Sequence, residues 1–597
     1  MPDSLFGQDF QAVYSGAGAA HPSPEDWRDC PIYFVMLDRF NNPAAPPAHL
    51  PFDDPSFDRY QGGNFAGVQD KLGYIKRLGA GAIWLSPVLK NLPFSAGSYH
   101  GYGIHDFLHA EPRFASRPAS ADDELRALVD AAHAEGLYVV LDIVLNHVGD
   151  VFAYDCDPGD TTCIGSAGAL ASFHPSTQSI AWRDVSGAPR PDWPNSAQIA
   201  VAPNDALVWP REMQQDGFFR RQGSMPSPDD DTIGDFASLK QMLTEQVSLQ
   251  NFLIRAYQYV IARFDVDGFR IDTLRYLKGG LQLTFGNAIR EFALSIGKKN
   301  FFTFGEVWTG DSEAAIARFI GRNSADANGD LVGVDAALDY PLFNVLKPTV
   351  KGFAAPSELV AMFQHRKLIE KDILSSHGDA TRFFVTFLDN HDVKERLRHF
   401  DPTQQSALDD EVTLGLACLA SLPGIPCIYY GTEQGLHGVG SDAAVREALW
   451  GGPGFDETAP FYAAISKICA VRSSEPALRY GRFYFRQLSG NGTDFGFSTF
   501  SPGVIAFSRI LNDREVLTVA NAVKSGGQSL DVIVDSTLSP AGKALQTLYT
   551  NKGHSTAPAP VSEVQNASVA EVDGSTSRGR VHATHVTLQP GEVQIIG

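Results

Sequence analysis

"VDGFRID" (residues 266–272) is a short apolar run that ends on an arginine and an aspartate. Val266, Phe269 and Ile271 are typical of a buried β-strand, whereas Arg270 and Asp272 are charged side chains that are rarely buried without a partner. A structural ion pair would explain the two charges. A charged catalytic site at the end of the strand would explain them equally well, and the rest of the chain has to decide between the two.

Seven other short apolar runs resemble this one and alternate with amphipathic segments. The runs are 32–40, 82–88, 138–147, 301–308, 334–340, 383–392 and 424–431. Between them, segments such as 65–79 and 121–136 carry apolar residues at helical spacing. Eight strands alternating with helices predict an α/β fold, a parallel (β/α)₈ TIM barrel. A doubly wound open sheet is the alternative, but the first run lacks the Gly-rich phosphate turn that usually follows it.

Three segments fall outside this alternation. Residues 1–27 are expected to form a loosely ordered N-terminal arm. Residues 148–234 are rich in Pro, Gly, Ser and Asp and too long for a simple loop, so we expect an inserted subdomain after the third strand. Residues 476–597 contain short alternating strands separated by turn residues, which predicts a C-terminal antiparallel β-sandwich. The barrel then comprises residues 28–147 and 235–475.

Composition and charge exclude some classes of partner. The chain of 597 residues has a net charge of −21, which disfavours nucleic acid as a partner. Its 39 Phe, 18 Tyr and 7 Trp suit a neutral ring-shaped substrate such as a sugar. The most apolar long segment, 412–430, is interrupted by Pro423, Gly424 and Pro426, so we expect no membrane span. No oligomeric state is predicted.

The first residues and the cysteines bear on the compartment. "MPDSLFGQDFQ" (1–11) does not have the basic and then apolar pattern of a signal peptide. The protein is therefore expected either in the cytoplasm or outside the cell after removal of a leader. Cys156 and Cys163 would form a disulfide if the protein is exported and would stay free thiols in the cytoplasm.

Polar side chains end four of the predicted strands. They are Asp142, Asn146 and His147; Arg270 and Asp272; Glu306; and Asp389, Asn390, His391 and Asp392. In a (β/α)₈ barrel these strand ends meet at the rim that carries the active site. Paired carboxylates there suit glycoside hydrolysis, in which one carboxylate attacks the anomeric carbon and a protonated second one donates to the leaving oxygen.

Four of these segments carry a family resemblance. "DIVLNH" (142–147), "GFRIDTLRY" (268–276), "GEVW" (305–308) and "FLDNHD" (387–392) resemble, in order and spacing, the signature regions of the α-amylase superfamily, glycoside hydrolase family 13. The resemblance covers about residues 30–475. It implies a retaining enzyme that cleaves α-1,4-linked glucans or maltooligosaccharides by double displacement.

The resemblance also assigns roles to residues of the chain. It implies that Asp272 is the nucleophile, that Glu306 is the general acid and then the base, and that Asp392 is the third acid, which binds sugar hydroxyls. Further substrate-binding residues that it implies are Arg270, which keeps the nucleophile ionised, His147, His391, Tyr102 and Tyr276. The family often has histidine where this chain has Tyr276, so recognition of the sugar beyond the cleavage point differs.

The resemblance implies two alternatives for a metal ion. Asn146, Asp235 and the Tyr276 carbonyl match the family's calcium ligands and would form an all-oxygen site. Some family members lack this ion and have a side-chain bridge in its place. No organic cofactor is expected.

The sequence is compatible with several activities. Hydrolysis is the leading prediction, an α-glucan transglycosylase is the nearest rival, and an α-glucosidase on short sugars is another. A catalytically dead carbohydrate-binding relative would lack one of the three acids, and all three are present. Trp308, Trp209 and Phe285 are each expected in either the groove or the core, and Arg446 and Glu447 are interpreted as a structural pair.

Overall fold

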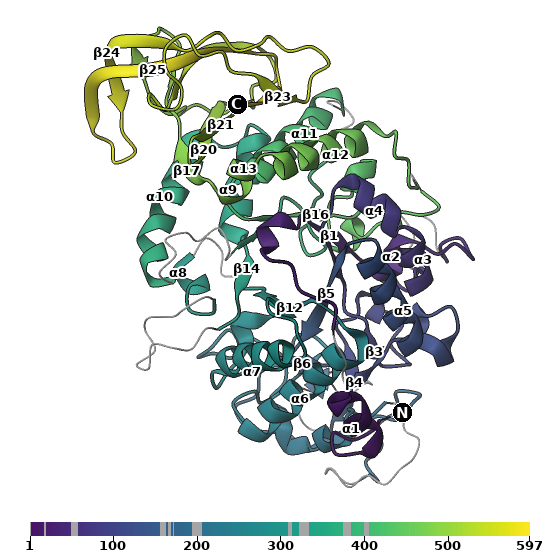
Figure 1. The fold of residues 1–597 in the computed structure, drawn as a ribbon. Helices are drawn as coiled ribbons and strands as arrows, with labels where there is room; N and C mark the ends of the chain where they lie inside the picture. Colours follow the sequence, from purple (N-terminus) through teal and green to yellow (C-terminus); the bar gives the residue numbers. More distant parts are fainter. Residues whose placement is uncertain are drawn as a thin grey trace.

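An eight-stranded parallel barrel forms the centre of the molecule (Figure 1). The computed structural model describes residues 2–16, 20–48, 58–155, 163–164, 169–170, 172–193, 206–308, 313–320, 333–373, 384–398, 405–452 and 454–597. The barrel strands are β1 (Ile32–Val35), β2 (Ala82–Leu85), β5 (Tyr138–Val144), β12 (Gly268–Asp272), β13 (Phe302–Gly305), β14 (Ala336–Leu338), β15 (Phe384–Thr386) and β16 (Ile425–Tyr429). Their order around the barrel is β1-β16-β15-β14-β13-β12-β5-β2. Each strand lies within one of the eight apolar runs, which confirms the predicted (β/α)₈ fold.

Helices surround the barrel and bury one face each. They include α3 (Phe65–Asp70), α4 (Leu72–Leu78), α5 (Ala121–Ala134), α6 (Val247–Phe264), α7 (Leu281–Ser295), α9 (Tyr340–Val350), α10 (Pro356–Ile373), α11 (Gln405–Ser421) and α12 (Pro460–Ser474). The segment predicted as one helix at 65–79 is two, because Lys71 leaves the helical conformation with φ −107° and ψ 9°. Gly79 ends α4 with φ 105°, a left-handed conformation that favours glycine.

The N-terminal arm is more ordered than expected. It contains helix α1 (Gln8–Ser15), which packs against α6 (Figure 1). Phe10 is fully buried, and its ring stacks on Tyr259 with the centroids 4.9 Å apart. The Arg255 guanidinium lies over the ring of Phe10 as well. Burial of these aromatic rings holds the arm on the barrel.

Small antiparallel sheets follow β5. Strand β6 (His147–Val148) pairs with β11 (Lys240–Gln241), and β7 (Phe152–Tyr154) pairs with β10 (Ile180–Trp182). The β6–β11 pair joins the beginning of this insertion to the point where the chain returns to the barrel at α6. The alternatives for Cys156 and Cys163 lie outside the described side chains; the four described cysteines, Cys30, Cys418, Cys427 and Cys469, are free and buried.

Two five-stranded sheets form the C-terminal part of the chain, at the top of Figure 1. One contains β17 (Arg482–Phe485), β20 (Val504–Leu511), β21 (Arg514–Asn521), β26 (Val593–Ile596) and β23 (Thr547–Thr550). The other contains β18 (Leu488–Ser489), β22 (Gln528–Val534), β25 (Thr576–Leu588), β24 (Ser562–Ala570) and β19 (Asp494–Phe495). A short helix, α13 (Pro476–Tyr480), precedes them. Phe507 and Ile595 of the first sheet belong to the same buried cluster as the barrel core.

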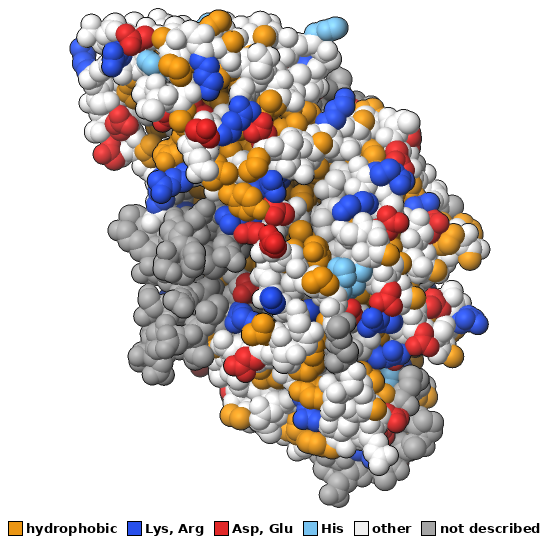
Figure 2. Space-filling model, viewed as in Figure 1, with side chains coloured by type: hydrophobic (Ala, Val, Ile, Leu, Met, Phe, Trp, Pro, Cys, Tyr) orange, Lys and Arg blue, Asp and Glu red, His pale blue; other side chains and the backbone are white. Residues whose placement is uncertain are grey.

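Charge is mixed on the surface. Acidic and basic side chains are interspersed on the face that Figure 2 shows. Among the described helices, none is long and apolar enough to span a lipid bilayer.

Candidate active site

The three predicted acids line one cavity of about 580 Å³. Asp272 ends β12, Glu306 directly follows β13, and Asp392 follows β15. Because the carboxyl ends of parallel barrel strands meet at one rim, residues far apart in sequence come together there. His100, Tyr102, His147 and Tyr276 line the same cavity.

Arg270 connects the carboxylates. Its side chain is fully buried, and Nη1 donates hydrogen bonds of 2.9 Å to Asp272 Oδ1 and to Asp142 Oδ1. Nη2 donates to Glu306 Oε2 at 2.9 Å. Burial lowers the pKa of Arg270, but the carboxylates, Asp142 foremost, raise it well above its usual value. One ionised guanidinium therefore holds Asp272 and Glu306 as neighbours, and the Asp272 half of the ion pair in "VDGFRID" also lines the cavity.

Glu306 is set up to be protonated at neutral pH. Burial raises its pKa to about 8, and the negative charges of Asp272 and Asp392 act in the same direction. Arg270 and the Thr273 backbone N–H, 3.2 Å from Oε2, lower it only in part. A carboxyl group that keeps its proton near pH 7 can serve as a general acid.

Asp392 is held from two sides. Arg446 Nη2 lies 3.1 Å from Asp392 Oδ1, and His391 Nε2 lies 3.2 Å from Oδ2. The sequence suggested that Arg446 pairs with Glu447, and this is wrong. Glu447 pairs instead with Arg396 at 2.6 Å, because consecutive side chains here face different elements.

The two predicted histidines are neutral groups with free ring nitrogens. Burial lowers the pKa of His147, and it lowers that of His391 well below the usual range. Among the described residues, His147 Nε2 and His391 Nδ1 have no hydrogen-bond partner. The Tyr102 hydroxyl lies 2.6 Å from His391 Nε2 and donates to Asp142 Oδ2 at 2.8 Å. His147 lines the cavity and can hydrogen-bond a sugar hydroxyl there, whereas His391 is not among the residues that line it. The Tyr102 ring offers an apolar face at the same cavity.

Aromatic rings are exposed at the same cavity. Trp308 is 46% exposed and stacks on Tyr340 with the centroids 4.9 Å apart. Phe236 is 44% exposed and meets the Tyr276 ring edge-on at 6.2 Å. Phe285 is fully buried in the core, and Trp209 is not among the residues that line the cavity. An exposed ring beside the three carboxyl groups of this cavity is suited to stacking on a sugar.

Sequence reasoning missed some residues of the cavity. His100, two residues before Tyr102, lines the cavity, and burial lowers its pKa to about 3. Asp442 and Phe236 also line it. The segment "YHGYG" carried a usable signal for His100, since it adjoins Tyr102. Phe236 and Asp442 lie in loops whose positions depend on contacts distant in sequence.

Two of the three predicted calcium ligands, Asn146 and Asp235, lie on either side of Gln241, and other groups already bond their oxygens. Asn146 Oδ1 accepts from Gln241 Nε2 at 3.3 Å, and Asp235 Oδ1 accepts from the Gln241 backbone N–H at 3.0 Å. Asp235 Oδ2 accepts from the Tyr154 hydroxyl at 2.6 Å. The Tyr276 ring lies in the catalytic cavity.

A buried ammonium group lies beside Asp235. Lys240 Nζ is 3.6 Å from Asp235 Oδ2 and 3.1 Å from Asp150 Oδ1. It also lies over the rings of Phe152 and Tyr154, at 5.2 Å and 5.0 Å from their centroids. Calcium requires six to eight oxygen ligands with free lone pairs. These residues therefore do not fit a calcium ion in this arrangement.

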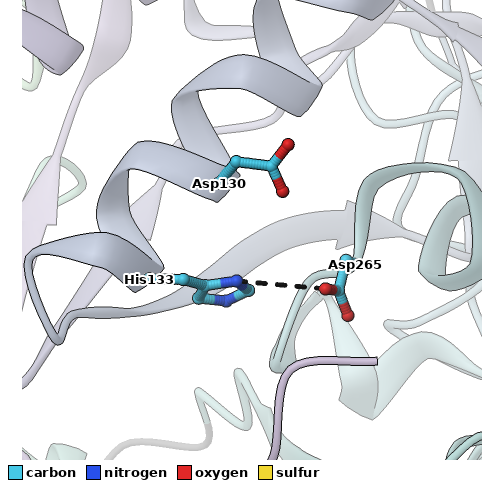
Figure 3. Close-up of side chains that lie close together, drawn as sticks. All are labelled: Asp130, His133 and Asp265. Atoms are coloured by element: carbon cyan, nitrogen blue, oxygen red, sulfur yellow. Dashed lines mark ion pairs between the residues drawn. The ribbon is translucent and has the colours of Figure 1, made fainter. Parts of the chain in front are cut away.

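A different group of residues could hold a metal ion at the other end of the barrel (Figure 3). Its ligand atoms, from Asp130, His133 and Asp265, lie within 4.8 Å of one another. Asp265 directly precedes the β12 region, so this group is remote from the catalytic rim. Lys298 Nζ already lies 2.8 Å from Asp265 Oδ1, and its positive charge disfavours a metal cation at the same carboxylate.

Comparison with known proteins gives one family. Residues 34–450 match the family model described as "Alpha amylase, catalytic domain". The chain is 27% identical over 456 residues to an alpha-amylase of Streptomyces lividans, covering 71% of this chain and 47% of that protein. It is 25% identical over 508 residues to a cyclomaltodextrin glucanotransferase of Bacillus sp. (strain 1-1), covering 83% of this chain and 60% of that protein. The chain thus spans about half the length of these curated relatives.

Solved structures share the fold. The alpha-amylase of Geobacillus thermoleovorans, complexed with acarbose, has a TM-score of 0.62 and 24% identity, covering 96% of this chain and 99% of that one. CldA, a cyclomaltodextrin glucanotransferase, has a TM-score of 0.66 and 22% identity, again covering 96% and 99%.

Proposed function

This chain belongs to the alpha-amylase family, and on that premise we propose that it is a retaining glycoside hydrolase of α-1,4-linked glucans or maltooligosaccharides. The observation that carries the proposal is the buried Arg270 guanidinium, which bonds Asp272 and Glu306 at 2.9 Å each. It sets the Asp272 carboxylate beside a second carboxyl group whose pKa is raised to about 8. Double displacement requires a nucleophilic carboxylate and, beside it, a protonated carboxyl group that acts as the acid.

In the first step, the Asp272 carboxylate attacks the anomeric carbon while the bond from this carbon to the glycosidic oxygen breaks. Glu306 donates its proton to that leaving oxygen, and a covalent glycosyl ester of Asp272 forms. In the second step, the Glu306 carboxylate takes a proton from water, and the resulting hydroxyl attacks the same carbon and releases Asp272. Asp392, held by Arg446 and His391, and the free Nε2 of His147 bind the hydroxyls of the reacting sugar.

A transglycosylase is the second candidate, and the exposed rings favour it. Trp308 and Phe236 are 46% and 44% exposed at the cavity, so a sugar stacked on them would compete with water in the second step. Relatives of both kinds are similar to this chain. An α-glucosidase that accepts only short sugars is a further outcome of the same experiment.

We also propose that the chain works without calcium at the Asn146–Asp235 position. The Lys240 ammonium supplies a positive charge to Asp150 and Asp235 there, at 3.1 Å and 3.6 Å.

Product analysis tests the proposal. The protein is incubated with soluble starch and with maltoheptaose, and the products are sized over time. Shorter products indicate hydrolysis, and longer or cyclic products indicate transfer. Glucose released from short sugars without attack on starch indicates an α-glucosidase. No turnover of any α-glucan would contradict the proposal.

Glu306→Gln is the matching variant, with an expected loss of about 10²–10⁴-fold in kcat because the general acid is removed. Glu433→Gln is the control. Glu433 is also a fully buried glutamate, but it accepts hydrogen bonds from Tyr33 and Tyr74 and does not line the cavity. Equal turnover in the Glu306→Gln variant and the wild type would overturn the assignment.

A further inference from the structure

A second cavity lies at the opposite end of the barrel from the acids. Its volume is about 330 Å³, and Pro31 and Gly81, which line it, directly precede β1 and β2. Residues of α4 and of α12 form its walls. The catalytic cavity opens at the other ends of the same strands, so the two sites are separate.

Positive charge gathers in this cavity. Four basic side chains and one acidic side chain line it: Lys76, Arg77, Arg472, Arg479 and Asp29. The chain as a whole has a net charge of −21, so a local excess of basic side chains is opposite in sign to the net charge of the protein. Glu457 pairs with Arg77 at 2.8 Å, and Asp29 pairs with Arg479. The remaining excess is carried by Lys76 and Arg472.

Arg472 is a buried cation that donates its hydrogen bonds to neutral backbone carbonyls. It is 2% exposed, and its two terminal nitrogens donate to the backbone carbonyls of Ala420, Leu478, Gly424 and Arg28. Burial lowers its pKa to about 10. Within the described chain its Nε–H is buried without a hydrogen-bond partner. An unpaired buried donor costs stability unless a ligand or water satisfies it.

Arg479, in the same cavity, also has a buried Nε–H group. It pairs with Asp29 through Nη1 and donates to the Ser473 carbonyl through Nη2 at 3.1 Å. Its Nε–H is also buried and without a partner among the described residues. Two unpaired arginine donors thus belong to side chains that line one positively charged cavity.

We propose that this cavity binds a phosphate-type oxyanion, either inorganic phosphate or the phosphoryl group of a sugar phosphate. A tetrahedral oxyanion offers several acceptor oxygens and negative charge, which match arginine donors better than a neutral molecule does. The volume of 330 Å³ is within the range of small-molecule sites, so the cavity has room for an ester group beside the phosphoryl group. The Ser466 and Ser473 side chains are further polar groups of the lining.

Isothermal titration of the full-length protein tests this proposal, with sodium phosphate as one ligand and glucose 1-phosphate as the other. Sodium chloride at matched ionic strength is the control for general screening. We expect saturable binding of phosphate and none of chloride. Tighter binding of the ester identifies a sugar phosphate as the ligand, and equal binding identifies free phosphate. Absence of saturable heat with both phosphates would overturn the proposal.

A pair of variants locates the binding. Ser473→Glu adds a carboxylate to the cavity lining, and we expect it to weaken phosphate binding at least ten-fold. Ser474→Glu is the matched control, because Ser474 is the next residue, is also exposed and does not line the cavity. Arg479→Gln is the second test variant, with the same expected loss. Turnover of an α-glucan at the far end of the barrel shows that each variant is folded. Unchanged phosphate affinity in both test variants would place the ligand elsewhere and refute the assignment.

Discussion

Glu306 owes its raised pKa mainly to burial and then to the charges of Asp272 and Asp392. Arg270 opposes this effect, yet the pKa remains at about 8. The ionised form of Glu306 is therefore disfavoured in the folded state, and the proposed proton donor carries an energetic cost above its ordinary pKa.

The rate should depend on the Glu306 proton. Because its pKa is about 8, kcat/KM should be constant near pH 7 and fall as the pH rises through about 8. Initial rates on maltoheptaose between pH 5 and pH 10 measure this limb. A rate that stays constant up to pH 10 would show that Glu306 does not supply the proton.

The stability should change with pH in a defined direction. The pKa of Glu306 is raised from its ordinary value of 4.5 to about 8 on folding. The contribution of Glu306 to the free energy of unfolding is therefore fully present below about pH 4.5. It is lost as the pH rises through about 8. Glu306→Gln removes this titration, so the Tm of the variant should exceed that of the wild type at pH 8 and differ little at pH 4.5. Thermal unfolding at both pH values measures the difference in Tm between the variant and the wild type. If this difference were smaller at pH 8 than at pH 4.5, the prediction would be contradicted.

Lys240 lies where the insertion joins the barrel. It lies in β11, which pairs with β6, and its ammonium bridges Asp150 and Asp235. Because a buried ion pair loses much stability when one partner is removed, this lysine matters more for the junction than an exposed one would.

Chelation and substitution test this junction together. A chelator such as EDTA should leave both Tm and turnover unchanged. Lys240→Met should destabilise the protein by about 3–5 kcal/mol, because two carboxylates lose their cation. Lys467→Met on exposed α12 is the control and should shift Tm little. A fall of Tm in EDTA that calcium restores would show that the ion binds after all.

The barrel core continues into one sheet of the C-terminal sandwich, and the sandwich also has buried clusters of its own. Phe507, Val516 and Ile595 belong to the buried cluster that continues into the barrel. Arg509, fully buried in β20, donates through Nη1 to the Ser421 carbonyl at the end of α11. The two parts are thus joined by apolar contact and by hydrogen bonds to backbone.

Removal of residues 476–597 should therefore expose apolar surface on the barrel helices. We expect the shortened chain to be poorly soluble and to unfold at a lower Tm, and not merely to lose adsorption to starch granules. Expression of residues 1–475, followed by thermal unfolding, measures this. A soluble truncated protein with wild-type Tm and turnover would contradict the shared core.

Local patterns made the barrel and most of the catalytic rim predictable from the sequence. The eight apolar runs locate the strands, and the residues that end them, such as Asp272 and Glu306, come to one cavity because parallel strands share a rim. The partner of Arg446 and the place of Lys240 were not predictable. Each depends on a contact between loops far apart in sequence, and local periodicity carries no information about such contacts.

Trp308 gives the protein a spectroscopic property. Among the described residues that line the cavity of the three acids it is the one tryptophan, and almost half of its surface faces water. Indole emission shifts to shorter wavelength when an apolar surface replaces water around the ring. Binding of an oligosaccharide over Trp308 would therefore shift the fluorescence emission of this residue. Occupancy of the cavity then becomes measurable without a label, even in a variant that leaves the sugar intact.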